Sequence, residues 1–326
     1  MKALVCTHYG PPSELVLQEV PEPVVQETDV LVDIQAAGIN YPDTLIIENR
    51  YQFKPDLPFS PGGEFAGRIR KVGAQVQGLT VGQAVIGFSG WGAFAEQIAV
   101  PADTLFTLPD GVPFEVAGTL LMTYGTAYHA LKDRAQLQPG ETVLVLGAAG
   151  GLGTATIELA KAMGARVIAA ASTPEKLQAC RDHGADAVID YSTEDVRARI
   201  KELTDGRGVD VVCDPVGGDI SELALRSTAW RGRFLVIGFA SGDIPRIPLN
   251  LPLLKGCALV GVFWGDYMKR ERAAVQADVD ALVDLYLSDK IRPTITQRYS
   301  LAQTAAALEG LKARKVIGKW VVIPGQ

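Results

Sequence analysis

The stretch ETVLVLGAAGGLGTATIELAKAMGARVIAAASTPEKL, residues 141–177, decides the fold of this chain. Residues 142–146 are a run of apolar or β-capable side chains, which predicts a buried strand, and residues 147–153 predict a tight turn after it. Residues 154–163 carry apolar side chains at helical spacing, and residues 166–171 form a second apolar run. The stretch therefore predicts a strand, a turn, a helix and a second strand in that order.

The turn carries a dinucleotide-binding fingerprint in which Ala148 takes the first glycine position. We expect the backbone of Gly150, Gly151 and Leu152 to approach a pyrophosphate at the positive N-terminus of the helix. Gly153 would let helix and strand pack closely. A glycine-rich heptapeptide alone is weak, but its place after a strand and before a helix is the context that the fingerprint requires. The stretch therefore predicts dinucleotide binding rather than a plain structural turn.

The end of the second strand indicates which dinucleotide binds. A site selective for NAD usually has an acid about 20 residues past the glycines, which accepts from the ribose 2′-hydroxyl. This chain has Ala171, Ser172 and Thr173 there, and Lys176 follows. Hydroxyl donors and a cation suit a 2′-phosphate, so we expect NADPH (NADP+). The alternative is that Ser172 only caps the next helix and Lys176 is a solvated surface residue.

The whole chain has the composition of an ordinary globular protein, and its 326 residues are enough for two domains with separate cores. A net charge of −6 and the lack of a Lys/Arg block argue against a nucleic-acid partner. No signal peptide and no apolar run of membrane-spanning length is recognised, so we expect a cytoplasmic protein without a membrane partner.

The cysteines and histidines do not predict a metal site. The four cysteines lie far apart and form no C-x-x-C pair, so we expect reduced, mostly buried thiols. The three histidines share no metal-ligand spacing with them. The residues concerned are Cys6, Cys180, Cys213, Cys257, His8, His129 and His183.

The first part of the chain, up to about residue 124, has short β-like runs separated by turns rich in Gly and Pro. This pattern is typical of a small, irregular antiparallel barrel. The runs are residues 30–36, 66–72, 84–88 and 94–100.

From residue 126 to about 265, strands and helices alternate, which predicts an α/β fold with a doubly wound parallel sheet. The six expected strands are residues 142–146, 166–171, 187–190, 209–214, 234–237 and 259–263. A helix over 115–131 should bridge the domains. The tail should contain helices at 272–287 and 301–311 and a closing strand at 320–323 that returns to the first domain. We therefore expect a discontinuous barrel domain, 1–124 and 266–326, and a dinucleotide-binding domain, 125–265.

Several further motifs occur in a fixed order over essentially the whole chain. They are AAGINYPD (36–43), PGGEFAG (61–67), TYGTAYHAL (123–131), GAAGGLG (147–153), DPVGG (214–218), IGFASG (237–242) and GVFWG (261–265). Together they resemble the medium-chain dehydrogenase/reductases, and within them the zinc-free NADPH:quinone oxidoreductases related to zeta-crystallin. The resemblance implies a Rossmann domain joined to a GroES-like, irregular antiparallel β-barrel that carries the catalytic residues.

The zinc-binding members of this superfamily have Cys-His where this chain has Asn40-Tyr41, and His-Glu where it has Gly63-Glu64. Without thiolate and imidazole at these places a catalytic zinc has no adequate ligand set, so alcohol dehydrogenation is disfavoured. We expect hydride addition to a small-molecule quinone or α,β-unsaturated carbonyl. The alternatives are an enoyl-thioester reductase and a non-catalytic, NADPH-binding protein of the crystallin kind.

The resemblance also implies particular site residues. Asn40 lies in the loop expected beside the nicotinamide, where its amide would donate to the cofactor or a substrate carbonyl; the alternative is a turn cap before Pro42. Tyr51 resembles the family's pocket tyrosine, whose phenol would donate to a carbonyl oxygen; a core or rim position is the alternative.

The remaining expected residues contact the cofactor. Thr126 and Tyr128 are expected to pack against the nicotinamide half, and Gly217 to lie close to the ribose. The residues expected against the cofactor after the last two strands are Gly238, Phe239, Ala240, Phe263, Trp264 and Gly265. Ser172, Lys176 and Tyr191 resemble the cluster that holds the adenosine 2′-phosphate. Arg314 takes the place of an arginine that reaches the phosphates in relatives, or else is an exposed cation near Lys312, Lys315 and Lys319. Phe263 and Trp264 are large and apolar and could instead belong to the core.

The last strand of the parallel sheet is expected to pair with its mate in a second subunit. Residues 258–262 are apolar and uncharged, as suits an edge strand that a partner covers. We therefore expect a homodimer.

Overall fold

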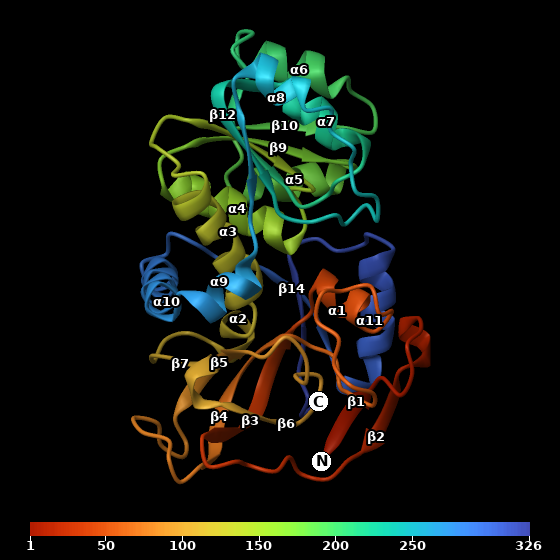
Figure 1. Ribbon diagram of the computed structural model, residues 1–326, viewed down its shortest axis with the longest axis vertical. Helices are drawn as coiled ribbons and strands as arrows, with labels where there is room; N and C mark the ends of the chain where they lie inside the picture. The colour runs from red at the N-terminus through yellow and green to blue at the C-terminus, as the bar shows by residue number, and fades with distance from the viewer. The chain divides into compact units, whose positions relative to one another are not determined.

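The computed structural model describes residues 1–326 and divides the chain into two compact units (Figure 1). The first unit contains Met1–Met122, Val279–Val283 and Pro293–Gln326, and the second contains Thr123–Asp278 and Asp284–Arg292. Residues 266–278 and 284–292 thus belong to the second unit, whereas a division at residue 265 was expected. One cause is the buried carboxylate of Asp278, which accepts hydrogen bonds from Lys132 and Tyr267 of the same unit.

The second unit is built on a parallel sheet with the strand order β10-β9-β8-β11-β12-β13. This is the order of a doubly wound Rossmann sheet, so the predicted fold is confirmed. β8, β9 and β11 are almost wholly buried because both faces of the sheet are covered by helices. The strands are β8 (Thr142–Leu146), β9 (Arg166–Ala171), β10 (Ala187–Asp190), β11 (Val209–Asp214), β12 (Thr228–Val236) and β13 (Ala258–Gly261).

Helices cover both faces of this sheet. Figure 1 shows α6, α7 and α8 on one side of the strands and α4 and α5 on the other. The change of side occurs after β10, as the strand order requires. The helices are α4 (Gly151–Ala162), α5 (Pro174–Asp182), α6 (Val196–Leu203), α7 (Asp219–Arg226) and α8 (Asn250–Lys255).

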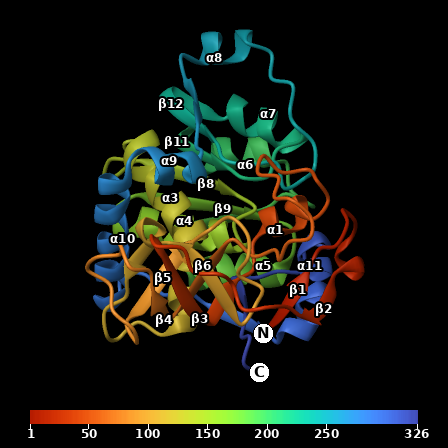
Figure 2. The ribbon, with the colours of Figure 1, turned by 60° about the horizontal axis from the view of Figure 1, so that its bottom comes forward.

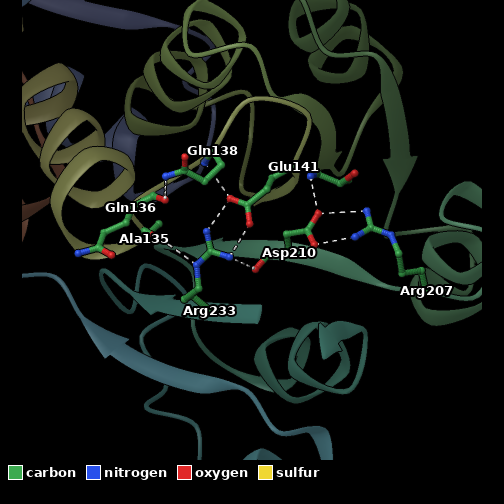
Figure 3. Close-up of polar contacts among 8 residues, drawn as sticks. Ala135, Gln136, Gln138, Glu141, Arg207, Asp210 and Arg233 are labelled. Atoms are coloured by element: carbon green, nitrogen blue, oxygen red, sulfur yellow. Dashed lines mark hydrogen bonds and ion pairs between the residues drawn. The ribbon is translucent and has the colours of Figure 1, made fainter. Parts of the chain in front are cut away.

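An ion-pair network links the strands of this sheet near their amino-terminal ends (Figure 3). Arg233 in β12 binds both carboxylate oxygens of Glu141, and its Nε donates to the carbonyl oxygen of Ala135 at 2.9 Å. Asp210 in β11 accepts from the backbone N–H of Thr142 at 2.7 Å and from the guanidinium of Arg207. The network therefore links β8, β11 and β12 at the end of the sheet opposite to their carboxyl ends.

The segment before β8 is helical from residue 114 to 134, with a break after residue 117. It contains two π-helical segments, a form often found at functional sites. Its parts are α2 (Phe114–Ala117), η3 (Leu120–Gly125), α3 (Thr126–His129) and η4 (Ala130–Arg134). Two helices follow β13, namely α9 (Trp264–Arg270), which the sequence did not predict, and α10 (Arg272–Leu287), which it did.

The first unit contains a two-stranded sheet, β1-β2, and a seven-stranded sheet in the order β14-β15-β3-β4-β5-β7, with β6 also paired to β3. The pairs are antiparallel except β14 with β15. β15 pairs with β3, so the tail returns to this unit as predicted. The strands are β1 (Lys2–Val5), β2 (Val16–Glu19), β3 (Asp29–Gly38), β4 (Glu64–Val72), β5 (Ala84–Phe88), β6 (Gln97–Pro101), β7 (Leu105–Thr107), β14 (Ile295–Tyr299) and β15 (Lys319–Val322).

Short helices complete the first unit. Figure 2 shows α11 beside α1, and α11 also contacts η1. They pack on a core that includes Ile46, Phe65, Phe94 and Leu308. The helices are η1 (Pro12–Glu14), α1 (Tyr41–Ile46), η2 (Ala102–Thr104), η5 (Leu301–Gln303) and α11 (Thr304–Lys312).

The cysteines are free thiols, as predicted, and all are buried except Cys257, which is half-buried. None of the helices is both long and apolar enough to span a bilayer.

Candidate functional site

The turn between β8 and α4 has the geometry of a dinucleotide cradle. A Cβ at Gly153 would lie 2.4 Å from the carbonyl oxygen of Ala148, so only glycine lets the helix start this close to the strand. A Cβ at Gly150 would meet only the carbonyl oxygen of Gly147, at 3.6 Å, and no side chain caps the helix. The first backbone N–H groups of α4 have no acceptor within the helix and carry its positive partial charge. The turn therefore fits a pyrophosphate held by Gly150, Gly151 and Leu152.

The other expected cofactor residues of the second unit follow the carboxyl ends of strands. Because the six strands are parallel, these ends lie along one edge of the sheet. Ser172 follows β9, Tyr191 follows β10 and Gly217 comes soon after β11. The residues after β12 and β13 are Gly238, Phe239, Ala240, Phe263, Trp264 and Gly265.

The turns after β11 and β12 are bonded to each other around Gly217. The backbone of Gly217 has φ 72°, and a Cβ there would lie 2.9 Å from the ring of Phe239. The N–H of Ala240 donates to the carbonyl oxygen of Pro215 at 3.0 Å. Asp214 fixes the backbone of the turn after β11, because its buried carboxylate accepts from the N–H groups of Val216 and Gly217 at 2.8 and 2.9 Å.

The ends of β9 and β10, which are followed by Ser172 and Tyr191, are hydrogen-bonded to each other. Tyr191 donates its N–H to the carbonyl oxygen of Ala171 at 3.1 Å, and Ser192 donates its hydroxyl to the carbonyl oxygen of Ser172 at 2.9 Å. The residue that caps α5 is Thr173, whose hydroxyl accepts from the N–H of Lys176 at 3.3 Å. Ser172 is therefore not needed as a cap, which removes the alternative given for it above.

The bridging helix and α9 form a second cluster in this unit. Trp264 is 3% exposed and packs against Gly125, where a Cβ would lie 2.4 Å from the indole ring. Its indole N–H is buried and has no acceptor in the protein. His129 stacks on Tyr267 with ring centroids 3.9 Å apart. Phe263 is 46% exposed, so it is not a core residue, whereas Trp264 is one.

The expected residues of the bridging helix differ in burial. Thr126 is buried and Tyr128 is half-buried, with the ammonium of Lys132 5.5 Å from the centre of the Tyr128 ring. Tyr124, four residues before Tyr128, belongs to the core and donates its hydroxyl to Glu158 at 2.7 Å.

In the first unit, Asn40 lies in a buried polar cluster. Its amide Nδ2 donates to Glu64 Oε1 at 2.8 Å and to the carbonyl oxygen of Gly38 at 3.3 Å. Its carbonyl Oδ1 accepts from the ammonium of Lys319 at 2.7 Å. The expected donation from Asn40 to a bound acceptor would have to replace the longer of its two N–H bonds, the one to Gly38.

Two buried carboxylates complete this cluster. Glu64 accepts from the backbone N–H of Met122 at 2.8 Å and from Lys319 at 3.3 Å. Asp43 accepts from the backbone N–H of Asn40 at 2.7 Å. Burial raises the pKa of Asp43 to about 7, against the lowering effect of the N–H of Asn40 and the charge of Lys319. The cluster thus holds one cation and two acids, one of which titrates near neutral pH.

Sequence reasoning did not select Glu64, Asp214 or Lys319 as site residues. The sequence feature that could have indicated these buried charges is a charged residue within an otherwise apolar stretch, such as the lysine in VIGKWVVI, residues 316–323. Lys319 had been named only as a lysine near Arg314 in the sequence, and it is 3% exposed. Arg314 itself is exposed and follows α11 with φ 57°.

Tyr51 lies in the loop between α1 and β4 and packs against the core of the first unit. Its ring meets that of Phe53 edge-on, with centroids 5.5 Å apart. Burial, and secondly the charge of Asp43, raise the pKa of Tyr51 to about 12. The phenol therefore stays protonated at neutral pH and can donate a hydrogen bond.

Known proteins resemble this chain over nearly its whole length. Residues 26–110 match the family model described as alcohol dehydrogenase GroES-like domain, and residues 151–284 match the one described as zinc-binding dehydrogenase. The chain is 39% identical over 324 residues to the quinone oxidoreductase-like protein 2 homolog of Nematostella vectensis, with 98% of this chain and 88% of that protein covered. It belongs to the quinone oxidoreductase family.

Further members of the quinone oxidoreductase family support the assignment. The Pseudomonas aeruginosa quinone oxidoreductase is 36% identical over 318 residues, with 97% of each protein covered. The structure of the Escherichia coli quinone oxidoreductase complexed with NADPH superposes with a TM-score of 0.94 at 31% identity, covering 99% of this chain and 100% of that one. The predicted membership of the medium-chain dehydrogenase/reductases is thereby confirmed, and the chain is an oxidoreductase of this family.

One of the two matching family models is described as a zinc-binding dehydrogenase, and zinc in proteins is held by Cys, His, Asp or Glu side chains. The structure contains no group of three or more His, Cys, Asp or Glu side chains placed to hold a metal ion. Where the zinc-binding members have Cys and His, this chain has Asn40, whose side chain is an amide, and Gly63, which has no side chain.

Proposed function

We propose that this protein transfers a hydride from NADPH to quinones or small α,β-unsaturated carbonyls, and that it does so without zinc. The observation that carries the proposal is the end of β9, where Ser172 and Lys176 take the place of the acid found in NAD-selective sites. Relatives support it, because the Escherichia coli structure is that of a quinone oxidoreductase complexed with NADPH.

The second unit would bind and orient the cofactor. The amino end of α4 would hold the pyrophosphate, while Ser172, Lys176 and Tyr191 would hold the 2′-phosphate. A bound NADPH supplies the hydride. Arg314 of the first unit is proposed as a further phosphate ligand, as the resemblance implies.

The first unit would supply hydrogen-bond donors to the acceptor oxygen. Tyr51 keeps its proton at neutral pH, because its pKa is raised to about 12. Its phenol would stabilise the negative charge that develops on the acceptor oxygen as the hydride arrives. Asn40 would donate the N–H that now bonds to the carbonyl oxygen of Gly38.

The polar cluster around Asn40 supports hydride transfer without zinc. In this cluster the ammonium of Lys319 already donates to Asn40 and Glu64. The ammonium already occupies these two acceptors, and a metal ion would find neither thiolate nor imidazole among its neighbours.

Parallel assays test the proposal. NADPH consumption would be followed with 1,4-naphthoquinone, crotonaldehyde and an acryloyl thioester, and zinc content would be measured in the same active material. We expect turnover of the quinone or the enone without stoichiometric zinc. Turnover confined to zinc-loaded protein, or no turnover of any acceptor, would contradict the proposal; the second result would favour a non-catalytic, NADPH-binding role.

Cofactor choice is tested by Lys176→Ala, with Lys201→Ala in α6 as the matched control. Removal of the cation should raise the Kd of NADPH about tenfold and leave that of NADH nearly unchanged, since only NADPH carries the 2′-phosphate. The control should change neither constant. Equal weakening of both cofactors, or tighter binding of NADH by the unaltered protein, would argue against an NADPH site.

Reduction of an enoyl thioester is the second candidate. It is supported by the structure of the CurK enoyl reductase, which superposes with a TM-score of 0.88 at 25% identity and covers 99% of this chain. A kcat/KM for the acryloyl thioester that exceeds those of the quinone and the enone would favour this candidate.

A further inference from the structure

Lys319 is a buried cation that the proposed mechanism leaves without a catalytic role. It begins β15, the strand that the tail adds beside β3, and it is 3% exposed. Its ammonium donates to the carbonyl oxygen of Ile39 at 3.3 Å, to Asn40 Oδ1 at 2.7 Å and to Glu64 Oε1 at 3.3 Å. Its shortest hydrogen bond is therefore to the amide and not to the acid.

The chemistry of these partners defines which way the Asn40 amide faces. An ammonium only donates and an ionised carboxylate only accepts, so the amide oxygen must face Lys319 and the amide nitrogen must face Glu64. Glu64 is itself held by the backbone N–H of Met122 at 2.8 Å. The nitrogen's second N–H is then directed at the carbonyl oxygen of Gly38.

Stability alone does not explain a lysine at this place. A buried ion pair is often no more stabilising than well-packed apolar side chains of similar volume. Leucine or methionine would suit the apolar strand KWVV equally well. The buried ammonium of Lys319 instead selects one of the two possible orientations of the Asn40 amide.

We propose that Lys319 is a positioning residue that fixes the Asn40 amide and so aims its second N–H at the acceptor oxygen. The proposal rests on the proposed function in assigning that N–H to a bound acceptor. The orientation itself is independent of any activity and is measured separately below.

The test separates orientation from stability. Lys319→Met should lower the melting temperature, because Glu64 then loses its cation, and should lower kcat/KM for 1,4-naphthoquinone at least tenfold while the Kd of NADPH stays within about threefold. In Lys319→Met/Glu64→Gln the unpaired carboxylate of Glu64 is gone. At pH 6, where burial keeps Asp43 largely protonated, the melting temperature should therefore return towards that of the unaltered protein. Activity should stay low, because glutamine both donates and accepts and cannot fix the amide.

The matched control is Lys312→Met, which removes an exposed ion pair to Glu48 in the same unit. It should leave kcat/KM and the NADPH affinity unchanged. If the double variant regains activity together with its melting temperature, Lys319 serves only stability and the proposal is wrong.

Side-chain amide exchange tests the orientation even if no acceptor is turned over. In protein labelled with ¹⁵N at asparagine, the Asn40 amide pair is assigned by its absence in Asn40→Asp. We expect slow exchange with deuterium in the unaltered protein and exchange at least tenfold faster in the double variant. Equal exchange rates would overturn the positioning role, whereas an inactive but slowly exchanging protein would contradict only the proposed function.

Discussion

At the scale of single residues, the phenol of Tyr51 is the donor that this structure leaves best prepared for an acceptor. The Asn40 amide already makes two N–H bonds to the protein, whereas Tyr51 keeps its proton because its pKa is raised to about 12. We expect Tyr51→Phe to lower kcat for 1,4-naphthoquinone by about a hundredfold to a thousandfold, as loss of one donor to a developing oxyanion does. NADPH affinity should not change. Steady-state rates and a cofactor titration check this, and an unchanged kcat would remove Tyr51 from the mechanism.

Asp43 makes stability depend on pH in the direction opposite to most acids. Its pKa is about 7 in the folded protein and near the ordinary 3.8 when unfolded, so the folded state binds the extra proton between these values. Stability from this group is therefore lost as the pH rises from about 4 to 7.

The variant Asp43→Asn removes this dependence and keeps an oxygen to accept from the backbone of Asn40. Relative to the unaltered protein, we expect it to gain roughly 2–4 kcal/mol between pH 4 and pH 8. Urea midpoints at the two pH values measure the difference. If the difference in stability between Asp43→Asn and the unaltered protein does not grow from pH 4 to pH 8, Asp43 is ionised in the folded protein over this range.

At the scale of elements, the network of Figure 3 anchors three neighbouring strands of the parallel sheet. The hydrogen bond from Arg233, working against the opposing effect of burial, helps hold the pKa of Glu141 below its usual value. We expect Arg233→Met to lower the free energy of unfolding by about 1–3 kcal/mol, because it leaves a half-buried carboxylate unpaired. The loss should shrink as the pH falls below the ordinary pKa of a glutamate, since protonation removes the unpaired charge.

The control for Arg233 is Arg226→Met, which breaks a surface pair with Glu222 four residues earlier in α7. Such pairs contribute at most about 0.5 kcal/mol. Urea unfolding of both variants at pH 7 and at pH 3.5 separates the two cases. Equal small losses at both pH values would mean that the network does not anchor the strands.

Elements were predictable from the sequence where burial imposed a simple pattern. β8 and β9 were predicted at their observed bounds because both are continuous apolar runs in a sheet covered on both faces. β14, ITQRY, was missed because only its two ends are half-buried and its middle is polar and exposed. α9, WGDYMKR, was missed because it is only seven residues long and falls between the expected strand, which ended at residue 263, and the expected helix, which began at residue 272.

The candidate site was predictable only in its backbone part. The glycines of the β8–α4 turn are required by close approach, which leaves a motif in the sequence. The Asn40 cluster is assembled from β3, β4 and β15, and the long-range pairing of Lys319 with Asn40 leaves no local pattern. Burial of Lys319 could therefore not be told from exposure until the tail was placed beside β3.

At the scale of the whole molecule, one edge of the parallel sheet has the properties of a subunit interface. β13 is the last strand in the order and its residues are largely exposed. Large apolar side chains are exposed around it, including Trp230 at 72%, Leu253 at 78%, Leu254 at 73% and Leu259 at 39%. An uncovered edge with such side chains invites pairing with another chain.

We propose that this edge pairs with the same edge of a second copy, since an isologous contact buries one patch twice and closes without further growth. Light scattering should give twice the chain mass of 34.8 kDa for the unaltered protein. Leu259→Glu should give the monomer mass, because two carboxylates would face each other across the two-fold axis. Val24→Glu, at an exposed apolar position of the first unit, should leave the mass unchanged. A monomer at micromolar concentration without any substitution would mean that another partner, or none, covers β13.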